Sequence, residues 1–163
     1  MHNSRRTILS HTVLLFMLAG MVSCSGEDCP INNTVVGKMQ FYNQLDDAVA
    51  INGTLSVNVV RPQGDSVILN QVYNASTISF PLSYTQLTDT LIFDYNRGTA
   101  YDTLYISHTN TPTLVSIECG TAMFHTITAA HSTHHVIDTL IIKSPKVDYD
   151  ERENIQVIYR TDD

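Results

Sequence analysis

The chain has 163 residues, of which 43% are hydrophobic and 15% are charged, and its formal net charge is −7. A hydrophobic fraction of this size can build a buried core, which excludes a chain that is disordered as a whole. The length provides one domain of about 100–150 residues once a targeting segment is removed, and leaves no room for a second full domain. An acidic chain without a cluster of lysines or arginines repels phosphate backbones, so we exclude a nucleic-acid-binding protein.

The amino-terminal segment has the three zones of an export signal. Arg5 and Arg6 lie in its polar start, an apolar run covers residues 13–22, and small residues surround Ser23 and Cys24. The apolar run is shorter than the ~18–20 residues that cross a bilayer. We therefore predict a signal peptide over residues 1–23 and no permanent transmembrane helix.

The residues before Cys24 indicate a lipid anchor. Met21-Val22-Ser23-Cys24 resembles the bacterial lipoprotein box, in which the cysteine thiol is diacylated and becomes the first residue of the mature chain. Two acyl chains suffice for stable attachment to a membrane. The alternative is ordinary signal cleavage that leaves Cys24 as a free or paired thiol.

Residues 24–33 then form a short acidic tether. Its Ser-Gly-Glu-Asp at residues 25–28 is similar to the signal that sorts Bacteroidota lipoproteins to the outer face of the outer membrane, although a solvated linker has the same composition. Without residues 1–23 the chain keeps seven basic side chains against 16 acidic ones, a net charge of −9. We expect an outer-membrane lipoprotein of the cell envelope, on the periplasmic or the surface face.

The two remaining cysteines predict a disulfide. If Cys24 is acylated, Cys29 and Cys119 are an even pair in an oxidising compartment. A bond between them would close a loop of about 90 residues, which stabilises a fold by ~4–5 kcal/mol on the chain-entropy description. The alternative is a catalytic cysteine with a histidine partner.

Short runs rich in Val, Ile, Thr, Tyr and Phe follow from residue 34, and none has a helical spacing of apolar residues. Asn52-Gly53 between residues 48–51 and 54–60 predicts a tight hairpin, because this pair adopts the two positive φ angles of a type I′ turn. Asn96-Arg97-Gly98 predicts a second hairpin between residues 90–95 and 102–107. Further strands are expected at residues 66–73, 115–119, 123–128, 136–143 and 154–160.

Regular short strands with turns every 8–12 residues favour an antiparallel β-sandwich of eight or nine strands over residues 34–163. A closed barrel is the alternative. The chain contains no Trp, so the tryptophan that packs on the disulfide of antibody domains is absent. We therefore expect an immunoglobulin-like fold only in the generic sense.

Four sequence features carry a resemblance to a known family. They are Cys29 soon after the anchor, Phe41-Tyr42 in the first strand, Cys119-Gly120, and Ile137-Asp138-Thr139-Leu140. With these features, residues 29–160 resemble a family of small uncharacterised Bacteroidota lipoproteins with an immunoglobulin-like β-domain. The resemblance implies the location and the fold, and it implies no catalytic residues.

A group of histidines is the best candidate for a metal site. His125, His131, His134 and His135 lie within eleven positions, on a segment that the pattern assigns to a hairpin tip, and His108 is a further candidate from a neighbouring strand end. Neutral imidazoles grouped in this way bind Zn²⁺, Cu²⁺ or Ni²⁺. The alternative is a solvated loop in which histidine happens to be frequent.

The chain lacks the sequence signatures of common hydrolases and phosphate-binding loops. We therefore expect no enzyme and no cofactor, but a lipid-anchored, non-catalytic binding or structural module whose partner is an envelope protein or a glycan. The alternative function is a metal-binding accessory protein that uses the four histidines. An enzyme of unfamiliar type would need a cleft that collects histidines and carboxylates from distant strands.

Overall fold

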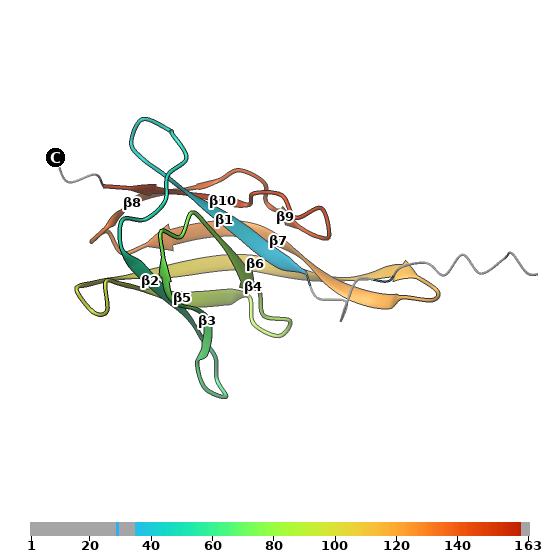
Figure 1. The fold of residues 1–163 in the computed structure, drawn as a ribbon. Coiled ribbons are helices and arrows are strands. Elements are labelled where there is room, and N and C mark those ends of the chain that lie inside the picture. Colours follow the sequence, from blue (N-terminus) through green and yellow to red (C-terminus); the bar gives the residue numbers. More distant parts are fainter. Residues whose placement is uncertain (1–28, 30–34, 161–163) are drawn as a thin grey trace, which may run out of the picture.

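The structure is a computed structural model that describes residue 29 and residues 35–160, and this part of the chain is all β. Two sheets pack face to face (Figure 1), which confirms the predicted β-sandwich and excludes a single closed barrel. The described strands are β1 (Val36–Tyr42), β2 (Thr54–Val60), β3 (Ser66–Tyr73), β4 (Thr77–Pro81), β5 (Thr88–Tyr95), β6 (Ala100–Ser116), β7 (Gly120–Ser132), β8 (Ile137–Ile142), β9 (Lys146–Val147) and β10 (Ile155–Tyr159).

The four-stranded sheet has the order β4-β1-β10-β8, and the six-stranded sheet has the order β3-β2-β5-β6-β7-β9. All neighbours are antiparallel except β1 and β10, which run parallel. The chain crosses between the sheets after β1, β3, β4, β7, β8 and β9. Most of the core is therefore built by strands that are distant in sequence.

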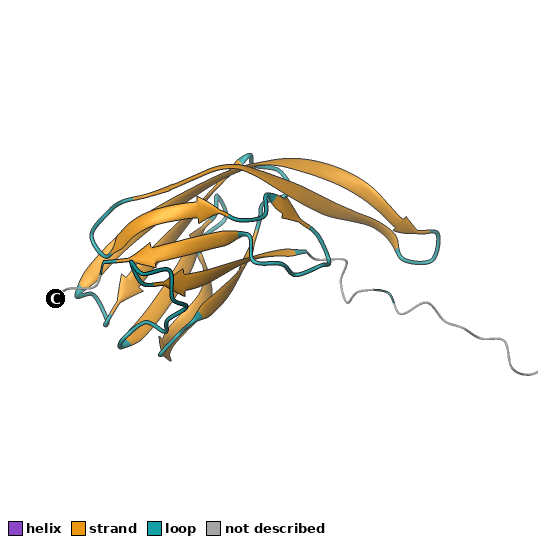
Figure 2. Ribbon diagram, turned by 90° about the horizontal axis from the view of Figure 1, so that it is seen from above, coloured by secondary structure: helices purple, strands orange, loops and turns teal. Residues whose placement is uncertain are grey.

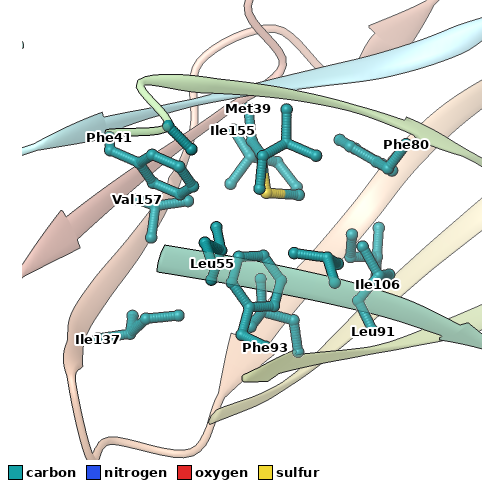
Figure 3. Close-up of a cluster of buried hydrophobic side chains, with 14 of the residues drawn as sticks. Met39, Phe41, Leu55, Phe80, Leu91, Phe93, Ile106, Ile137, Ile155 and Val157 are labelled. Carbon is teal, nitrogen blue, oxygen red and sulfur yellow. The ribbon is translucent and has the colours of Figure 1, made fainter. Parts of the chain in front are cut away.

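Alternating side chains of both sheets meet in one apolar core (Figure 3). Phe41 of β1 and Phe93 of β5 are fully buried and meet edge to face across the two layers, with ring centroids 6.5 Å apart. Removing one large apolar side chain from water contributes about 1.5–3 kcal/mol. Buried and less buried side chains alternate strictly in β1, β2 and β5, and in β2 and β5 this is the pattern that predicts the strands from the sequence.

The β6–β7 hairpin is longer than the sandwich. β6 has 17 residues and β7 has 13, and their outer halves extend past the other strands (Figure 2). β5 begins at Thr88 opposite Ser107, so β6 beyond His108 pairs with β7 alone. We call residues 109–124 the ribbon.

The predicted disulfide is present at the tip of the ribbon. Cys119 follows the last residues of β6 and is bonded to Cys29, with 5.3 Å between their Cα atoms. The bond joins the two cysteines over a sequence separation of 90 residues. The tip is thereby attached to the chain that precedes β1.

Two predicted elements are wrong. Residues 48–51 form no strand and contribute only an isolated bridge between Ala48 and Tyr42, so Asn52-Gly53 is not a hairpin turn. β2 pairs instead with β3 and β5, and Ile51 N–H donates to the carbonyl of Ala75. The expected strand at residues 115–119 is the end of β6 and the turn that follows it.

The predicted signal peptide over residues 1–23 lies outside the described residues, as do Cys24 and the tether over residues 24–33 apart from Cys29. Within the described part of the chain, no helix is long and apolar enough to cross a membrane.

The strands β4 and β9, with five and two residues, were not anticipated from the sequence.

A buried carboxylate fixes the crossing from β7 to β8. Asp102 accepts hydrogen bonds from the hydroxyl of Thr133 at 2.7 Å and from the backbone N–H groups of His135, Val136 and Ile137 at 2.8, 2.8 and 2.9 Å. Burial raises the pKa of Asp102, but these four donors outweigh it and lower the pKa below the usual value. The ionised carboxylate therefore holds the loop that carries the chain from one sheet to the other.

We expect Asp102→Asn to lower the free energy of unfolding by about 2–4 kcal/mol, because an amide turns one acceptor into a donor that faces other donors. Asp138→Asn is the matched control, since Asp138 lies partly exposed on β8 and pairs with Arg160 at 3.6 Å. That control is expected to change stability by less than about 1 kcal/mol. Urea unfolding at pH 7 measures both, and equal losses would contradict the assigned role of Asp102.

Candidate functional site

A cluster of buried polar side chains lies at the root of the ribbon. Asp89 of β5, His108 of β6 and His125 of β7 are 1%, 2% and 0% exposed, and Asn110 of β6 lies between the two histidines. Asp89 occupies the same face of β5 as Leu91 and Phe93, so the cluster continues the inner face of the six-stranded sheet. Polar groups buried in this way need partners, because an unpaired one costs about 1–3 kcal/mol.

A bulge in the β6–β7 pairing directs His125 inward. The register passes from Ser107 opposite Ala129 to His108 opposite Ile127, which leaves Thr128 without a partner on β6. One extra residue reverses which side chains of β7 face the core. His125 and Ile127 are therefore buried, although an unbroken alternation from Ala130 would place both on the outer face.

Asp89 is held from three directions. Its carboxylate accepts hydrogen bonds from the guanidinium of Arg61, from the backbone N–H of Ser83 at 2.8 Å, and from Nε2 of His108 at 2.9 Å. Arg61 also donates to the carbonyl of Pro81 at 3.1 Å. The carboxylate thus joins β5 to β6 and to the segment after β4.

Asn110 determines the proton positions on the two histidines. Its amide nitrogen donates to the carbonyl of Gln86 at 3.1 Å, so its side-chain oxygen faces the rings. That oxygen lies 2.8 Å from Nδ1 of His108 and 2.7 Å from Nδ1 of His125, and both nitrogens must donate to it. Both ring nitrogens of His108 face oxygen atoms, the side-chain oxygen of Asn110 and the carboxylate of Asp89.

His125 differs from His108, because its Nε2 atom is buried and has no hydrogen-bond partner in the described part of the protein. The ring meets His108 edge to face at 5.2 Å and stacks under Tyr84, which is partly exposed, at 5.8 Å. Burial first, and then the charge of His108, lower the pKa of His125 to about 4, while the carboxylate of Asp89 opposes both effects. At neutral pH this imidazole is therefore uncharged, with an unshared electron pair on Nε2.

The structure does not bring the four predicted metal-binding histidines together. His131 is exposed near the end of β7, and His134 and His135 follow in the loop to β8. His125 lies six positions before His131 in the same strand, a distance of about 20 Å. In the described residues no three His, Cys, Asp or Glu side chains are grouped closely enough to hold a metal ion. Metal binding by these residues stays a prediction.

The segment that carries these histidines is not the expected hairpin tip. The loop after Ser132 leads from β7 in the six-stranded sheet to β8 in the four-stranded sheet. His135 lies at its end, and its backbone N–H and Nδ1 atom are 2.8 and 3.3 Å from the carboxylate of Asp102. The local sequence does not distinguish a turn within one sheet from a crossing between two, because both need a short polar segment.

The cluster is arranged for structure more than for chemistry on a substrate. Asp89 and His108 have the contact of an acid–base pair, but the second nitrogen of His108 is occupied by Asn110 and both side chains are buried. A general base must reach the proton that it removes. The hydrogen bonds instead join β5, β6 and β7 where the ribbon leaves the sandwich.

Sequence reasoning did not group the histidines with the other members of the cluster, which come from four separate segments: Arg61, Tyr84, Asp89 and Asn110. A signal for Asp89 is nevertheless present. It stands in alternation with Leu91, Phe93 and Tyr95, and a carboxylate on an apolar strand face needs a buried cationic or hydrogen-bonding partner.

We expect the protein to lose stability as the pH falls from about 6.5 to about 4, by roughly 3 kcal/mol in total from His125. The pKa of His125 is lower in the folded state than in the unfolded state, so the unfolded chain binds the extra proton in this range and acid favours unfolding. The pKa of Asp102 is also lowered, but the stability that this carboxylate contributes is lost only at lower pH, as it becomes protonated.

Urea midpoints at pH 7, 6 and 5 test this expectation with His125→Asn, which keeps a donor toward Asn110 but does not titrate. The variant should show a flatter dependence of stability on pH than the parent. His131→Asn, at an exposed position of β7, should keep the parental slope. Equal slopes for parent and His125→Asn would contradict the assignment.

Comparison with known proteins places the chain in a family. No curated protein and no solved structure matches it. Residues 54–159 match a family described as a family of unknown function (DUF6452), and these residues include β2 to β10, the ribbon and the buried polar cluster. Because the match covers more than half of the 163 residues, the chain belongs to this family.

Proposed function

We propose that this chain is a lipid-anchored protein of the cell envelope, of the Bacteroidota lipoprotein kind, and that its β-sandwich is a non-catalytic binding or structural module. The observation that carries the proposal is the disulfide between Cys29 and Cys119. Disulfides persist in oxidising compartments, so the bond supports export of the chain. With those two cysteines paired, the remaining one of the three is Cys24, in the sequence context of an acylation site.

The anchor would hold the domain close to the membrane. Cys29 is five positions after Cys24, a reach of at most about 17 Å even when fully extended. Cys29 is in turn bonded to the ribbon tip, with 5.3 Å between the Cα atoms. A lipid on Cys24 would therefore tether the ribbon tip as well as the start of the domain.

The inward orientation of the polar cluster supports a binding or structural role. Apart from Nε2 of His125, its hydrogen-bonding groups contact one another or the backbone. An acidic mature chain attracts neither nucleic acids nor anionic lipids by charge. We expect the partner to be another envelope protein or a glycan, with the domain attached to the outer membrane.

Mass spectrometry of the full chain purified from bacterial membranes tests the anchor. We expect an amino-terminal peptide that begins at Cys24 and carries acyl chains. Cys24→Ser should move the protein from the detergent-soluble membrane fraction to the aqueous fraction, because the acyl chains supply the membrane affinity. The double variant Cys29→Ser, Cys119→Ser is the control and should stay with the membrane.

An unmodified thiol at Cys24 in the wild-type protein would overturn the proposal. The mass of the wild-type peptide is the deciding measurement, because an uncut signal peptide would also retain the Cys24→Ser variant in a membrane. A variant that is cut at the same place and still partitions with detergent would contradict the proposal too.

A further inference from the structure

Two large apolar side chains are exposed at the tip of the ribbon. Ile117 in the turn is 90% exposed, and Leu114 near the end of β6 is 66% exposed. The ribbon contains no Lys or Arg, and its one charged residue is Glu118. The tip is therefore an apolar protrusion. Because it carries no positive charge, it cannot bind lipid headgroups through Lys or Arg side chains.

The ribbon points away from the sandwich (Figure 1), and Cys119 at its tip is bonded to Cys29. If Cys24 carries the proposed lipid, its Cα atom lies no more than about 22 Å from that of Cys119, the sum of the extended chain to Cys29 and the 5.3 Å across the disulfide. Apart from Cys29 itself, no other described segment is fixed covalently so near the anchor. An apolar tip on such a short tether meets the bilayer before it meets any freely diffusing partner.

We propose that the ribbon tip inserts into the headgroup layer of the membrane that carries the chain, with Ile117 and Leu114 among the lipids. The inference rests on the proposed function, since the lipid on Cys24 brings the tip to the bilayer. A contact of two side chains would be too weak to hold the protein on a membrane alone. The anchor raises the local concentration of lipid so that this weak contact is populated.

The depth of insertion is limited by the backbone. Beyond Asn110 and His125 the ribbon is two strands wide, so its outer N–H and C=O groups have no ladder partner among the described strands. Unpaired peptide groups are excluded from the hydrocarbon region but are satisfied by water among the headgroups. The charged side chain of Glu118 limits the depth of insertion in the same way. The side chains of Ile117 and Leu114 would thus reach the acyl boundary while the strands stay hydrated.

The absence of Trp from the chain allows a direct test, because one introduced Trp is the sole reporter. Ile117→Trp is prepared as the acylated full chain and reconstituted into vesicles of phosphatidylcholine and phosphatidylethanolamine, with and without brominated acyl chains. Leu45→Trp is the matched control. Leu45 is 82% exposed and belongs to the loop after β1. This loop extends from the sandwich at a distance from the ribbon tip (Figure 1).

We expect the indole emission of the Ile117→Trp protein to shift to the blue on reconstitution. Brominated lipids should quench this emission several-fold more strongly than that of the Leu45→Trp protein. Equal quenching of the two variants would overturn the inference. A blue shift that grows with protein density and is insensitive to brominated lipids would also overturn it, because a second copy or another protein would then cover the tip.

The same samples separate this inference from the proposed function. Peptide mass and vesicle flotation report acylation and attachment. If the Ile117→Trp protein is acylated and floats, but its emission is not quenched, the anchor is sustained and the insertion is overturned. Protein that lacks acyl chains and does not float overturns both.

Discussion

The pairing of β6 with β7 along its whole length organises the molecule. Its inner half closes the six-stranded sheet between β5 and β9, and its outer half leaves the sandwich as the ribbon. Isolated two-stranded ribbons are marginally stable in water. This one is held at both ends, by the buried cluster around Asn110 at its root and by the disulfide of Cys119 at its tip. It can therefore act as a rigid extension of the sheet.

Two buried carboxylates border the apolar core, one on β5 and one on β6. Asp102 is satisfied by a hydroxyl and three backbone N–H groups, whereas Asp89 is satisfied by Arg61, His108 and one backbone N–H. Breaking either set leaves a buried charge without compensation, which costs several kcal/mol. The two carboxylates thus determine where the hydrophobic part of β6 begins and ends, and which loops lie against it.

The parts of the fold that the sequence predicts are those that local patterns control. Alternation of apolar and polar residues locates β2 and β5 within two residues, and the turn residues that precede β3 locate that strand. The disulfide follows from counting cysteines in an oxidising compartment. The hairpin at Asn52-Gly53 fails because β5 and β3, which are distant from residues 48–51 in sequence, occupy both edges of β2.

The polar cluster shows the limit of local reasoning more clearly. His125 and His131 are close in sequence, yet a single bulge and six extended residues place one in the core and the other on the surface. His125 instead meets His108, which is seventeen positions earlier on the neighbouring strand, through an oxygen of Asn110. Such a site depends on the strand register, and the register is decided by the whole sheet.

The disulfide acts on both the unfolded and the folded chain. In the unfolded chain it closes a loop across a separation of 90 residues, which removes conformational entropy worth ~4–5 kcal/mol on the chain-entropy description. In the folded chain it bonds the ribbon tip to Cys29, which precedes β1. A lipid on Cys24 would then act on the sandwich at two points, the start of β1 and the tip of the ribbon. Two points of attachment restrict how a domain can tilt over a membrane, which one flexible tether does not, so the orientation of the domain would be set by the length and direction of the β6–β7 hairpin.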